Sequence, residues 1–367
     1  MRIGFISSNN GWGGGEKLLS HLIKEIRDQS HSIALVTRKE SPIAAWACKN
    51  QIQDVFYQRG YGRHPAYLRK LRNWVRHNEF DIIVLNDPHA ITSGGIATWG
   101  LPTTRIGMRH TIFPIRSAWK HCYLVDHVVC VSSAAQRECI AAGLSPEETS
   151  VIHGGIPFPK VMASDSREAR QNFQNESNQQ SEQHILAVGS LLPVKGFDTI
   201  IRSISAGIQS GHRWRLWLAG DGPELGQLAT IAREEGIENR VEFLGHRDDV
   251  ATLLTAADLF ISASHSEGLS LVLIEAMMAE CPIIATPVGG AREVLRIQEI
   301  GESPYAETFQ PCDIFGLTNA IINTLKNSDE RTSKARQAKQ WAEQQFSAQR
   351  MADEHVALYQ KLSRSKF

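Results

Sequence analysis

The sequence has no long apolar run and no regular cysteine pattern. Both absences narrow the class of protein to which it can belong. No stretch approaches the roughly 20 apolar residues that a membrane-spanning helix needs. The start of the chain, MRIGFISSNN, has one basic residue and a short apolar run, too short for a signal peptide. The six cysteines show no CxxC or other metal-ligand spacing, so we expect reduced thiols in a cytoplasmic protein.

The chain also lacks a net charge, but its charges are unevenly distributed. Residues 1–157 hold 18 Lys+Arg against 12 Asp+Glu, and the remainder holds 21 against 27. This balance argues against a general nucleic-acid binder. It indicates that the basic first half binds an anionic partner.

Short apolar runs alternate with helical spacing along most of the chain. In the first half the runs are RIGFIS, SIALVT, DIIVLN, TRIGM and HVVCVS, and in the second half HILAVGS, RLWLAGDG, RVEFLG, DLFISAS and CPIIATPVGG. This alternation predicts parallel sheets with crossover helices, which is an α/β fold. Gly or Asp-Gly follows several second-half runs, as expected where strands end in ligand-facing loops.

A length of 367 residues suggests about two domains. We predict a Rossmann-like domain over residues 1–163 and a second over 184–344, both doubly wound, with a cleft between them. The polar, Gln- and Ser-rich segment 164–183 reads as a linker or insert, with a short helix near Glu168–Phe173. Residues 345–367 read as a terminal helix that returns to the first domain.

The stretch SHSEGLSLVLIEAM, residues 264–277, sets two glutamates eight positions apart around a glycine turn. If a helix begins near Ser270, its free N–H groups suit a phosphate. Eight helical residues span about 12 Å, so Glu267 could meet a sugar while Glu275 accepts the hydroxyls of a ribose. The alternative is that the pair arises by chance, with a glutamate favoured by the helix dipole alone.

Other motifs flank this stretch in a fixed order. Upstream, VGSLLPVKGFDTI places Lys195 in a loop before a helix, where a lysine is either a diphosphate partner or an exposed loop residue. AGDGP, the two glutamates and TPVGG follow. This order resembles the retaining family-4 glycosyltransferases of the GT-B fold, in which two Rossmann-like domains face each other. With the first-half loops, the resemblance covers most of the chain.

The resemblance implies roles for individual residues of the second half. Lys195 would bind the donor diphosphate, Glu275 the ribose, and Glu267 would lie near the transferred sugar and the reaction centre. A further set would contact the donor through backbone N–H groups or lie beside the nucleotide: Gly268, Leu269, Ser270 and His246. His246 is equally an ordinary surface histidine. Ser190 stands where the family often has arginine, so diphosphate binding would lose one charge-assisted fork.

Loops of the first half also resemble the family. Gly14 and Gly15 lie in the segment NGWGGGE, which resembles the family's GGxE loop at the donor phosphates or acceptor; the alternative is a flexible turn and helix cap. His110 follows the TRIGM run, where the family places a histidine that faces the donor sugar. VSSAAQRECI resembles a strand-to-helix turn in which Ser132 and Ser133 cap a helix.

A basic segment in the first half predicts an anionic partner. In the segment RGYGRHPAYLRKLRNWVRHNEF, apolar residues recur at helical spacing, which fits a crossover helix with its apolar face on the sheet. These residues are Tyr67, Leu68, Leu71, Trp74 and Val75. The cationic face is unusual, so we predict that it contacts anionic lipid head groups or a phosphorylated acceptor. The residues assigned to this acceptor or membrane side are Arg63, Arg69, Lys70, Arg72, Arg76 and Arg109.

The resemblance implies transfer of a sugar from a nucleotide-sugar to an acceptor hydroxyl with retained anomeric configuration. The acceptor would be an anionic cell-envelope glycan, such as a polysaccharide or lipopolysaccharide, or a lipid-linked intermediate. The chain has no Asp-x-Asp, and a fixed cation can replace a metal, so we expect neither metal nor cofactor. We expect a cytoplasmic enzyme, either free or peripheral on the inner face of the membrane. A nucleotide-sugar epimerase or hydrolase and a non-catalytic binding protein remain as alternatives.

Overall fold

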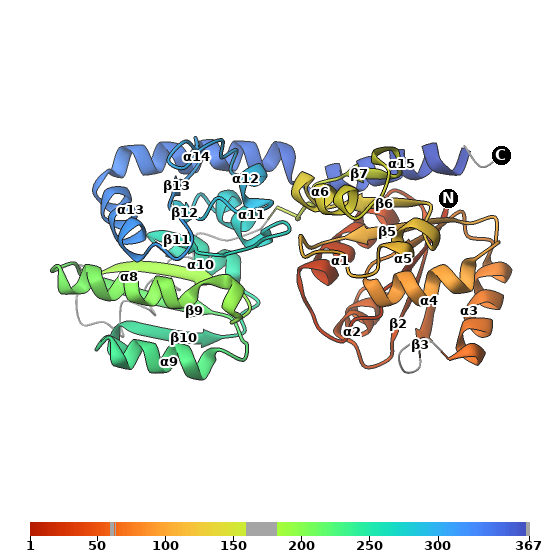
Figure 1. Cartoon of the computed structure of the whole chain (residues 1–367), viewed down its shortest axis with the longest axis horizontal. Helices are drawn as coiled ribbons and strands as arrows, with labels where there is room; N and C mark the ends of the chain where they lie inside the picture. The colour runs from red at the N-terminus through yellow and green to blue at the C-terminus, as the bar shows by residue number, and fades with distance from the viewer. Residues whose placement is uncertain (59–61, 63, 159–181, 365–367) are drawn as a thin grey trace. The chain divides into compact units, whose positions relative to one another are not determined.

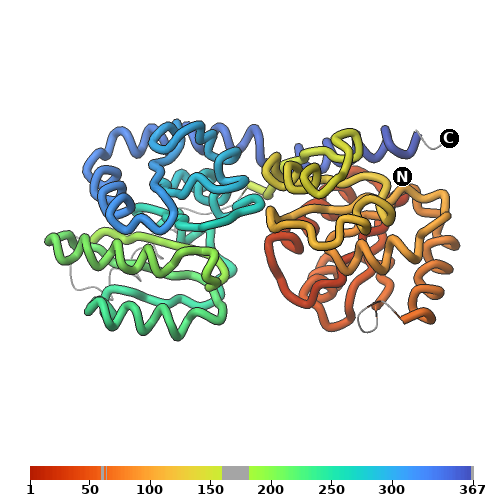
Figure 2. Tube along the Cα trace, viewed as in Figure 1, coloured from red at the N-terminus to blue at the C-terminus, as the bar shows by residue number. Residues whose placement is uncertain are grey.

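The computed structural model describes residues 1–58, 62, 64–158 and 182–364. The chain divides into two compact units: unit 1 is Met1–Pro157 with Phe346–Phe367, and unit 2 is Phe158–Gln345. Figure 2 traces the chain from unit 1 into unit 2 and back, so that both termini belong to unit 1. The segment 164–181 of the expected linker, with its short helix, lies outside the described residues.

Unit 1 is built on a parallel sheet of seven strands in the order β3-β2-β1-β4-β5-β6-β7. The strands are β1 (Arg2–Ile6), β2 (Ser32–Arg38), β3 (Val55–Gln58), β4 (Ile82–Leu85), β5 (Thr104–Arg109), β6 (His127–Cys130) and β7 (Thr149–Val151). The four residues of β4 are all buried, as a central strand covered by helices on both faces requires.

The helices of unit 1 begin at the signals that the sequence provides. Ser41, Asp87 and Ser132 each accept a hydrogen bond from a backbone N–H of the helix that follows. The terminal helix packs against the first helix of the unit. The helices are α1 (Gly14–Asp28), α2 (Pro42–Lys49), α3 (Pro65–Asn78), α4 (Pro88–Thr98), α5 (Ala118–Tyr123), α6 (Ser133–Ala141), the 3-10 turn η1 (Pro146–Glu148) and α15 (Ala348–Arg364) (Figure 1).

Unit 2 is built on a parallel sheet of six strands in the order β10-β9-β8-β11-β12-β13. The strands are β8 (Gln183–Val188), β9 (Trp214–Ala219), β10 (Val241–Gly245), β11 (Leu259–Ser262), β12 (Ile283–Ala285) and β13 (Glu307–Thr308). Its helices are η2 (Pro193–Lys195), α8 (Phe197–Gln209), α9 (Leu225–Glu234), η3 (Glu238–Arg240), α10 (Val250–Ala256), α11 (Leu271–Met278), α12 (Ala291–Val294), α13 (Ile314–Lys326) and α14 (Ser328–Gln345).

In both sheets the strand order reverses next to the first strand of the unit. The reversal falls between β1 and β4 in unit 1, and between β8 and β11 in unit 2. Loops on either side of such a reversal diverge at the carboxyl edge of the sheet and leave a ligand-binding crevice. The predicted α/β class with two doubly wound, Rossmann-like units is confirmed. Within the described residues no helix is long and apolar enough to cross a membrane.

Candidate functional site

The sequence motifs of the second half gather at the carboxyl edge of the unit 2 sheet. Lys195 follows β8, the Asp221 loop follows β9, His246 follows β10, and Glu267 follows β11. Because the strands are parallel, these loops emerge at the same edge.

Lys195 and Glu267 meet at the strand reversal. The ammonium of Lys195 donates to Glu267 Oε1, and Ser264 Oγ donates to the same oxygen at 2.9 Å. The side chain of Glu267 is one-tenth exposed and that of Lys195 about one-quarter exposed. The Lys195 ammonium and the buried Glu267 carboxylate therefore lie together at the carboxyl edge of the sheet, where the strand order reverses between β8 and β11.

Glycines at this edge allow backbone segments to approach closely. A Cβ atom on Gly290 would lie 2.2 Å from the carbonyl oxygen of Gly268, and Gly290 N donates to Glu267 O at 3.0 Å. Gly196 has φ +64°, and a Cβ there would lie 2.3 Å from the carbonyl oxygen of Ala263. The loops that carry Lys195 and Glu267 are thus locked to their neighbours through backbone.

The helix α11 begins where the sequence predicts, with Ser270 at its N-cap position. The Ser270 side chain makes no capping hydrogen bond, and Leu269 and Ser270 are both buried. Glu275 is half-buried one turn into the helix. The free N–H groups of the first turn carry the positive end of the helix dipole and can bind an anion.

Two predicted donor residues are more exposed. Ser190 lies on the surface of the loop after β8. His246 is two-thirds exposed, and its Nε2 lies 3.4 Å from Asp248 Oδ1. Lys195 and Glu267 contact each other, whereas His246 contacts Asp248 instead of this pair.

The unit 1 residues predicted from the resemblance gather at the carboxyl edge of its sheet. His110 Nε2 lies 2.9 Å from Asn86 Oδ1, which follows β4. A Cβ atom on Gly15 would lie 3.1 Å from His110 Cδ2, so the glycine loop passes directly over the imidazole. Ser8 N donates to Asp87 Oδ2 at 2.6 Å across the strand reversal. Asn86 and Asp87 were not predicted from the sequence, although they directly follow the apolar residues of β4 and precede Pro88, which starts α4.

The Gly-rich loop also closes on itself. Gly13 N donates to Glu16 Oε2 at 3.1 Å, and Asn9 Nδ2 donates to Glu16 Oε1 at 3.0 Å. Glu16 is buried and completes a capping box at the start of α1. The carboxylate therefore positions the loop, which places Gly14 and Gly15 in the first turn of the helix.

The terminal helix α15 places a second histidine close to His110. His110 and His355 both line a cavity of about 10 Å³, and His355 Nδ1 lies 3.0 Å from the Tyr359 hydroxyl. Burial, and then the positive charge of Arg109, lower the pKa of His110 to about 4. Burial lowers the pKa of His355 to about 3, with His110 as the next cause. Both imidazoles are neutral at physiological pH.

The basic residues of unit 1 have different roles. Arg69, Lys70 and Arg76 are exposed on α3, whose Leu71 packs in the core as predicted for a crossover helix. Arg72 Nη1 donates to Ala97 O at 3.0 Å and Trp99 O at 2.6 Å, which caps the end of α4.

The position of Arg109 differs from the prediction, which placed this residue on the acceptor or membrane side. Arg109 is buried, and its guanidinium donates to the carbonyl oxygen of Phe113. Because the side chain holds the loop after β5 from inside, it is not available to a membrane surface. Arg63 lies outside the described residues.

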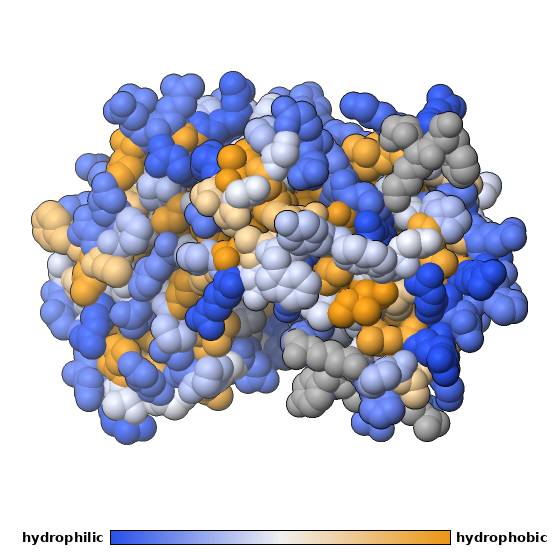
Figure 3. Space-filling view, turned by 45° about the vertical axis from the view of Figure 1, so that its right-hand side comes forward, coloured by the Kyte–Doolittle hydropathy of each residue, from blue (hydrophilic) through white to orange (hydrophobic). Residues whose placement is uncertain are grey.

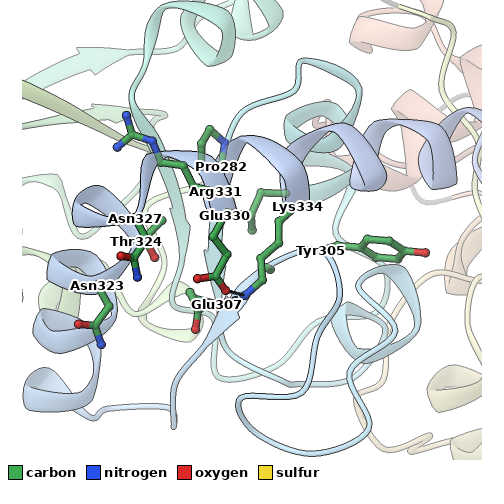
Figure 4. Close-up of a pocket in the computed structure, with 11 residues that line it drawn as sticks. Pro282, Tyr305, Glu307, Asn323, Thr324, Asn327, Glu330, Arg331 and Lys334 are labelled. Carbon is green, nitrogen blue, oxygen red and sulfur yellow. Dashed lines mark hydrogen bonds and ion pairs between the residues drawn. The ribbon is translucent and has the colours of Figure 1, made fainter.

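Unit 2 also has a polar pocket at the opposite edge of its sheet, where β12 and β13 begin (Figure 4). Its volume is about 230 Å³. Lys334 Nζ points toward Glu307 and Glu330, at 2.5 and 3.0 Å, so its charge is neutralised within the unit. This pocket is separate from the motif-bearing edge. Among the described residues no group of three or more His, Cys, Asp or Glu side chains could hold a metal ion.

Comparison with known proteins agrees with this geometry. Residues 168–341 match the family described as glycosyl transferases group 1, and residues 12–158 match glycosyltransferase family 4. The phosphatidylinositol N-acetylglucosaminyltransferase GPI3 subunit of Saccharomyces cerevisiae is 28% identical over 88% of this chain and 74% of its own length. The N-acetyl-alpha-D-glucosaminyl L-malate synthase of Bacillus anthracis is 30% identical over 49% of this chain and 46% of its own length. The crystal structure of Anabaena HepE with UDP-glucose superposes with a TM-score of 0.85, at 24% identity, over 98% of this chain and 100% of that one.

Two doubly wound units and the superposition on the HepE structure show the GT-B fold. The two family matches together span most of the sequence, and they follow each other in the order that the motifs predict. The chain therefore belongs to the glycosyltransferases, with a family 4 match in its first half and a group 1 match in its second.

Proposed function

We propose that the protein transfers a sugar from a uridine diphosphate sugar to a hydroxyl of a lipid-linked or other anionic envelope acceptor, with retention and without a metal. The observation that carries this proposal is the Lys195–Glu267 pair at the strand reversal of unit 2. A cation, a carboxylate and a helix N-terminus at one edge match a diphosphate attached to a sugar.

The choice of a uridine nucleotide rests on similarity. The HepE structures contain UDP, UDP with glucose, or UDP-glucose. The yeast and Bacillus relatives are named as N-acetylglucosaminyl enzymes. UDP-N-acetylglucosamine is accordingly the first donor to test, with UDP-glucose second.

Each residue in the proposed mechanism has one physical task. Lys195 and the first N–H groups of α11 stabilise the diphosphate charge that grows as the bond from the anomeric carbon to the phosphate oxygen breaks. The acceptor oxygen forms its bond on the face that the leaving group vacates, which retains configuration. The acceptor proton passes to the departing phosphate oxygen, so no enzyme nucleophile is required.

The remaining polar groups bind and orient the donor. Glu275 accepts hydrogen bonds from the ribose hydroxyls, and Glu267 lies beside the transferred sugar. Neutral His110 hydrogen-bonds the sugar or the leaving phosphate, since a cation next to an oxocarbenium-like sugar would oppose the reaction. Ser190 supplies a neutral hydroxyl where the family often has an arginine, so Lys195 carries more of the phosphate charge.

The acceptor side of the proposal rests on charge. The exposed cations Arg69, Lys70 and Arg76 on α3 favour an anionic surface or acceptor. A cytoplasmic enzyme that associates peripherally with the inner face of the membrane would satisfy this, because a lipid-linked acceptor presents its hydroxyl at that surface.

Calorimetric titration of UDP, GDP and ADP into the purified protein, with EDTA present, tests the donor half. We expect UDP to bind and Lys195→Ala to weaken it by about 10- to 100-fold, the worth of a charge-assisted hydrogen bond. Lys334→Ala, which removes a lysine paired at the opposite edge, is the matched control. Absence of UDP binding, or binding that requires a divalent ion, would contradict the proposal. Steady release of UDP from the sugar nucleotide without any acceptor would instead indicate a hydrolase.

A further inference from the structure

The region from the end of α4 to the end of α5 combines exposed aromatic side chains with an absence of acidic ones. No Asp or Glu occurs between Asp87 and Asp126. Five large apolar side chains in this stretch are between 43% and 64% exposed: Ile96, Trp99, Phe113, Trp119 and Tyr123. Exposed apolar side chains at this density mark an interaction surface. We refer to these five residues as the aromatic surface.

Hydrogen bonds and packing hold the aromatic surface together within unit 1. A Cβ atom on Gly95 would lie 2.7 Å from the carbonyl oxygen of Leu124, so the end of α4 packs directly on the end of α5. The Arg105 guanidinium lies 5.7 Å from the Trp99 ring centroid and pairs with Asp126 at 2.7 Å. The loop after β5 is fixed by the contact between Arg109 and Phe113 O.

The short helix α5 divides its residues between core and solvent. Trp119 and Tyr123 are four positions apart and share one face, and both are more than half exposed. His121 and the following Leu124 are buried. More than half of each aromatic side chain therefore lies outside the core, whereas His121 and Leu124 anchor α5 in unit 1.

Cations surround the aromatic surface. Arg116 is exposed just before α5, and Lys120 lies 6.0 Å from the Trp119 ring centroid. Arg72 ties α3 to the end of α4 through Ala97 O and Trp99 O. Arg69 and Arg76 lie three and four positions from Arg72, so they share its side of α3. On the face of the molecule that Figure 3 shows, hydrophobic and strongly hydrophilic residues lie side by side.

We infer that the aromatic surface is a membrane-docking site that inserts into the head-group region of an anionic bilayer. Tryptophan and tyrosine favour that region because one end of each ring is apolar and the other is polar. Lys and Arg near the surface each strengthen binding to anionic lipid, and an acidic residue would oppose it. The inference rests on the proposed lipid-linked acceptor, and it moves the main membrane contact from α3 to α4 and α5.

The position of this surface gives it a functional consequence. Phe113 is three residues from His110, and Arg109 fixes the loop between them. Phe113 therefore lies near the carboxyl edge of the unit 1 sheet, whereas Trp99 follows α4 and precedes β5, near the amino edge. A bilayer docked on the aromatic surface would cover the flank of the sheet formed by α4 and α5, and its Phe113 end would present the head group of a lipid-linked acceptor toward the edge that carries His110.

Vesicle flotation of the full chain tests the inference directly. We expect binding to phosphatidylcholine vesicles that contain phosphatidylglycerol, with little binding to phosphatidylcholine alone and a decrease at high salt. The paired change Trp119→Ser with Tyr123→Ser should reduce binding by about tenfold or more. Arg116→Glu with Lys120→Glu should reduce it by at least about tenfold, because each cation becomes an anion.

Phe315→Ser is the matched control, because Phe315 is 77% exposed on α13 of unit 2 and should leave vesicle binding unchanged. Calorimetric UDP binding in every variant separates this inference from the proposed function. Loss of vesicle binding with intact UDP binding supports the inference. Unchanged vesicle binding in the aromatic pair variant, or no binding to any vesicle, would overturn it. Failure of UDP binding in the unmodified chain would sink the donor proposal without affecting the vesicle result.

Discussion

The imidazole of His110 lies 2.9 Å from the side-chain oxygen of Asn86, and this contact joins the ends of two neighbouring strands in unit 1. An amide oxygen can only accept, so His110 Nε2 carries the proton and Nδ1 is the basic nitrogen. Burial keeps the pKa of this histidine at about 4, which makes it a neutral hydrogen-bonding group throughout the physiological range.

Asn86→Asp should give the transfer rate a new pH dependence. A carboxylate beside the imidazole raises the pKa of His110, so the ring becomes cationic as the pH falls through neutrality. A cation there opposes an oxocarbenium-like sugar, and the rate should fall with it. The unmodified enzyme should show no limb from His110 above about pH 5, one unit above its pKa. Asn86→Ala removes the acceptor without adding charge and should give a lower but equally flat profile. A flat profile for Asn86→Asp, alongside an NMR titration in which the His110 pKa does rise, would remove His110 from the reaction centre.

Stability of unit 1 should fall with acidification because burial lowers the pKa of three of its histidines. Burial lowers the pKa of His21 and His110 to about 4 and of His355 to about 3. In the unfolded chain these groups take up protons near pH 6.5, whereas in the folded unit they do not. Their contribution is therefore complete above about pH 6.5 and is lost as the pH falls toward about 4, at up to about 1.4 kcal/mol per pH unit for each histidine.

Substitution of His355 tests this reasoning. His355→Gln keeps a polar neutral group and should flatten the dependence of the unfolding free energy on pH, measured by hydrogen exchange of unit 1 amides between about pH 7 and 5. His246→Gln, at a two-thirds exposed site in unit 2, should leave that dependence unchanged. Equal slopes for the His355 variant and the unmodified chain would show that the buried ring is already protonated when folded.

Glu267→Gln should separate donor binding from transfer. Glu267 holds the ammonium of Lys195 and adds negative charge close to the proposed diphosphate position. An uncharged amide of the same shape frees Lys195 and removes that repulsion, so UDP should bind as tightly or a few-fold more tightly. Transfer should decrease, because the carboxylate beside the sugar is lost. Calorimetry with UDP and a separate assay of sugar transfer measure the two effects; weaker UDP binding would mean that Glu267 orients Lys195 rather than competing for it.

Local sequence patterns predicted the fold because the central strands are apolar throughout. The runs RIGFIS, DIIVLN and DLFISAS became β1, β4 and β11, whose residues are almost all buried. Some edge strands escaped detection, although the edge strand β10 was found in the run RVEFLG. β3 (Val55–Gln58) is only partly buried, and β13 (Glu307–Thr308) has two residues, so neither produces a distinct apolar run.

The site residues that could be predicted lie in short local motifs, whereas the others depend on contacts between distant parts of the chain. Lys195 and Glu267 were found because each lies in a short motif, and their mutual contact follows from parallel strands that end at one edge. Asn86 and His355 were not found. The role of Asn86 depends on its contact with His110, which follows the neighbouring strand. His355 reaches the cavity because α15, at the far end of the chain, packs in unit 1. Arg109 was misplaced because an arginine's position in the sequence does not tell whether its guanidinium caps a buried carbonyl or faces solvent.

Gly290→Ala should abolish transfer although it changes no polar group. The added methyl would lie 2.2 Å from the carbonyl oxygen of Gly268, and a backbone atom cannot move aside as a flexible side chain does. The segment Gly268–Ser270 would shift, and with it the hydrogen bond from Gly290 N to Glu267 O and the start of α11. Gly226→Ala is the matched control, because a Cβ there meets nothing within 4 Å and alanine favours the α9 helix. We therefore expect Gly290→Ala to lose both UDP binding and transfer while Gly226→Ala retains both with equal or greater thermal stability. Full activity in Gly290→Ala would show that the two loops adjust independently, and the glycine contact would then have no part in positioning Glu267.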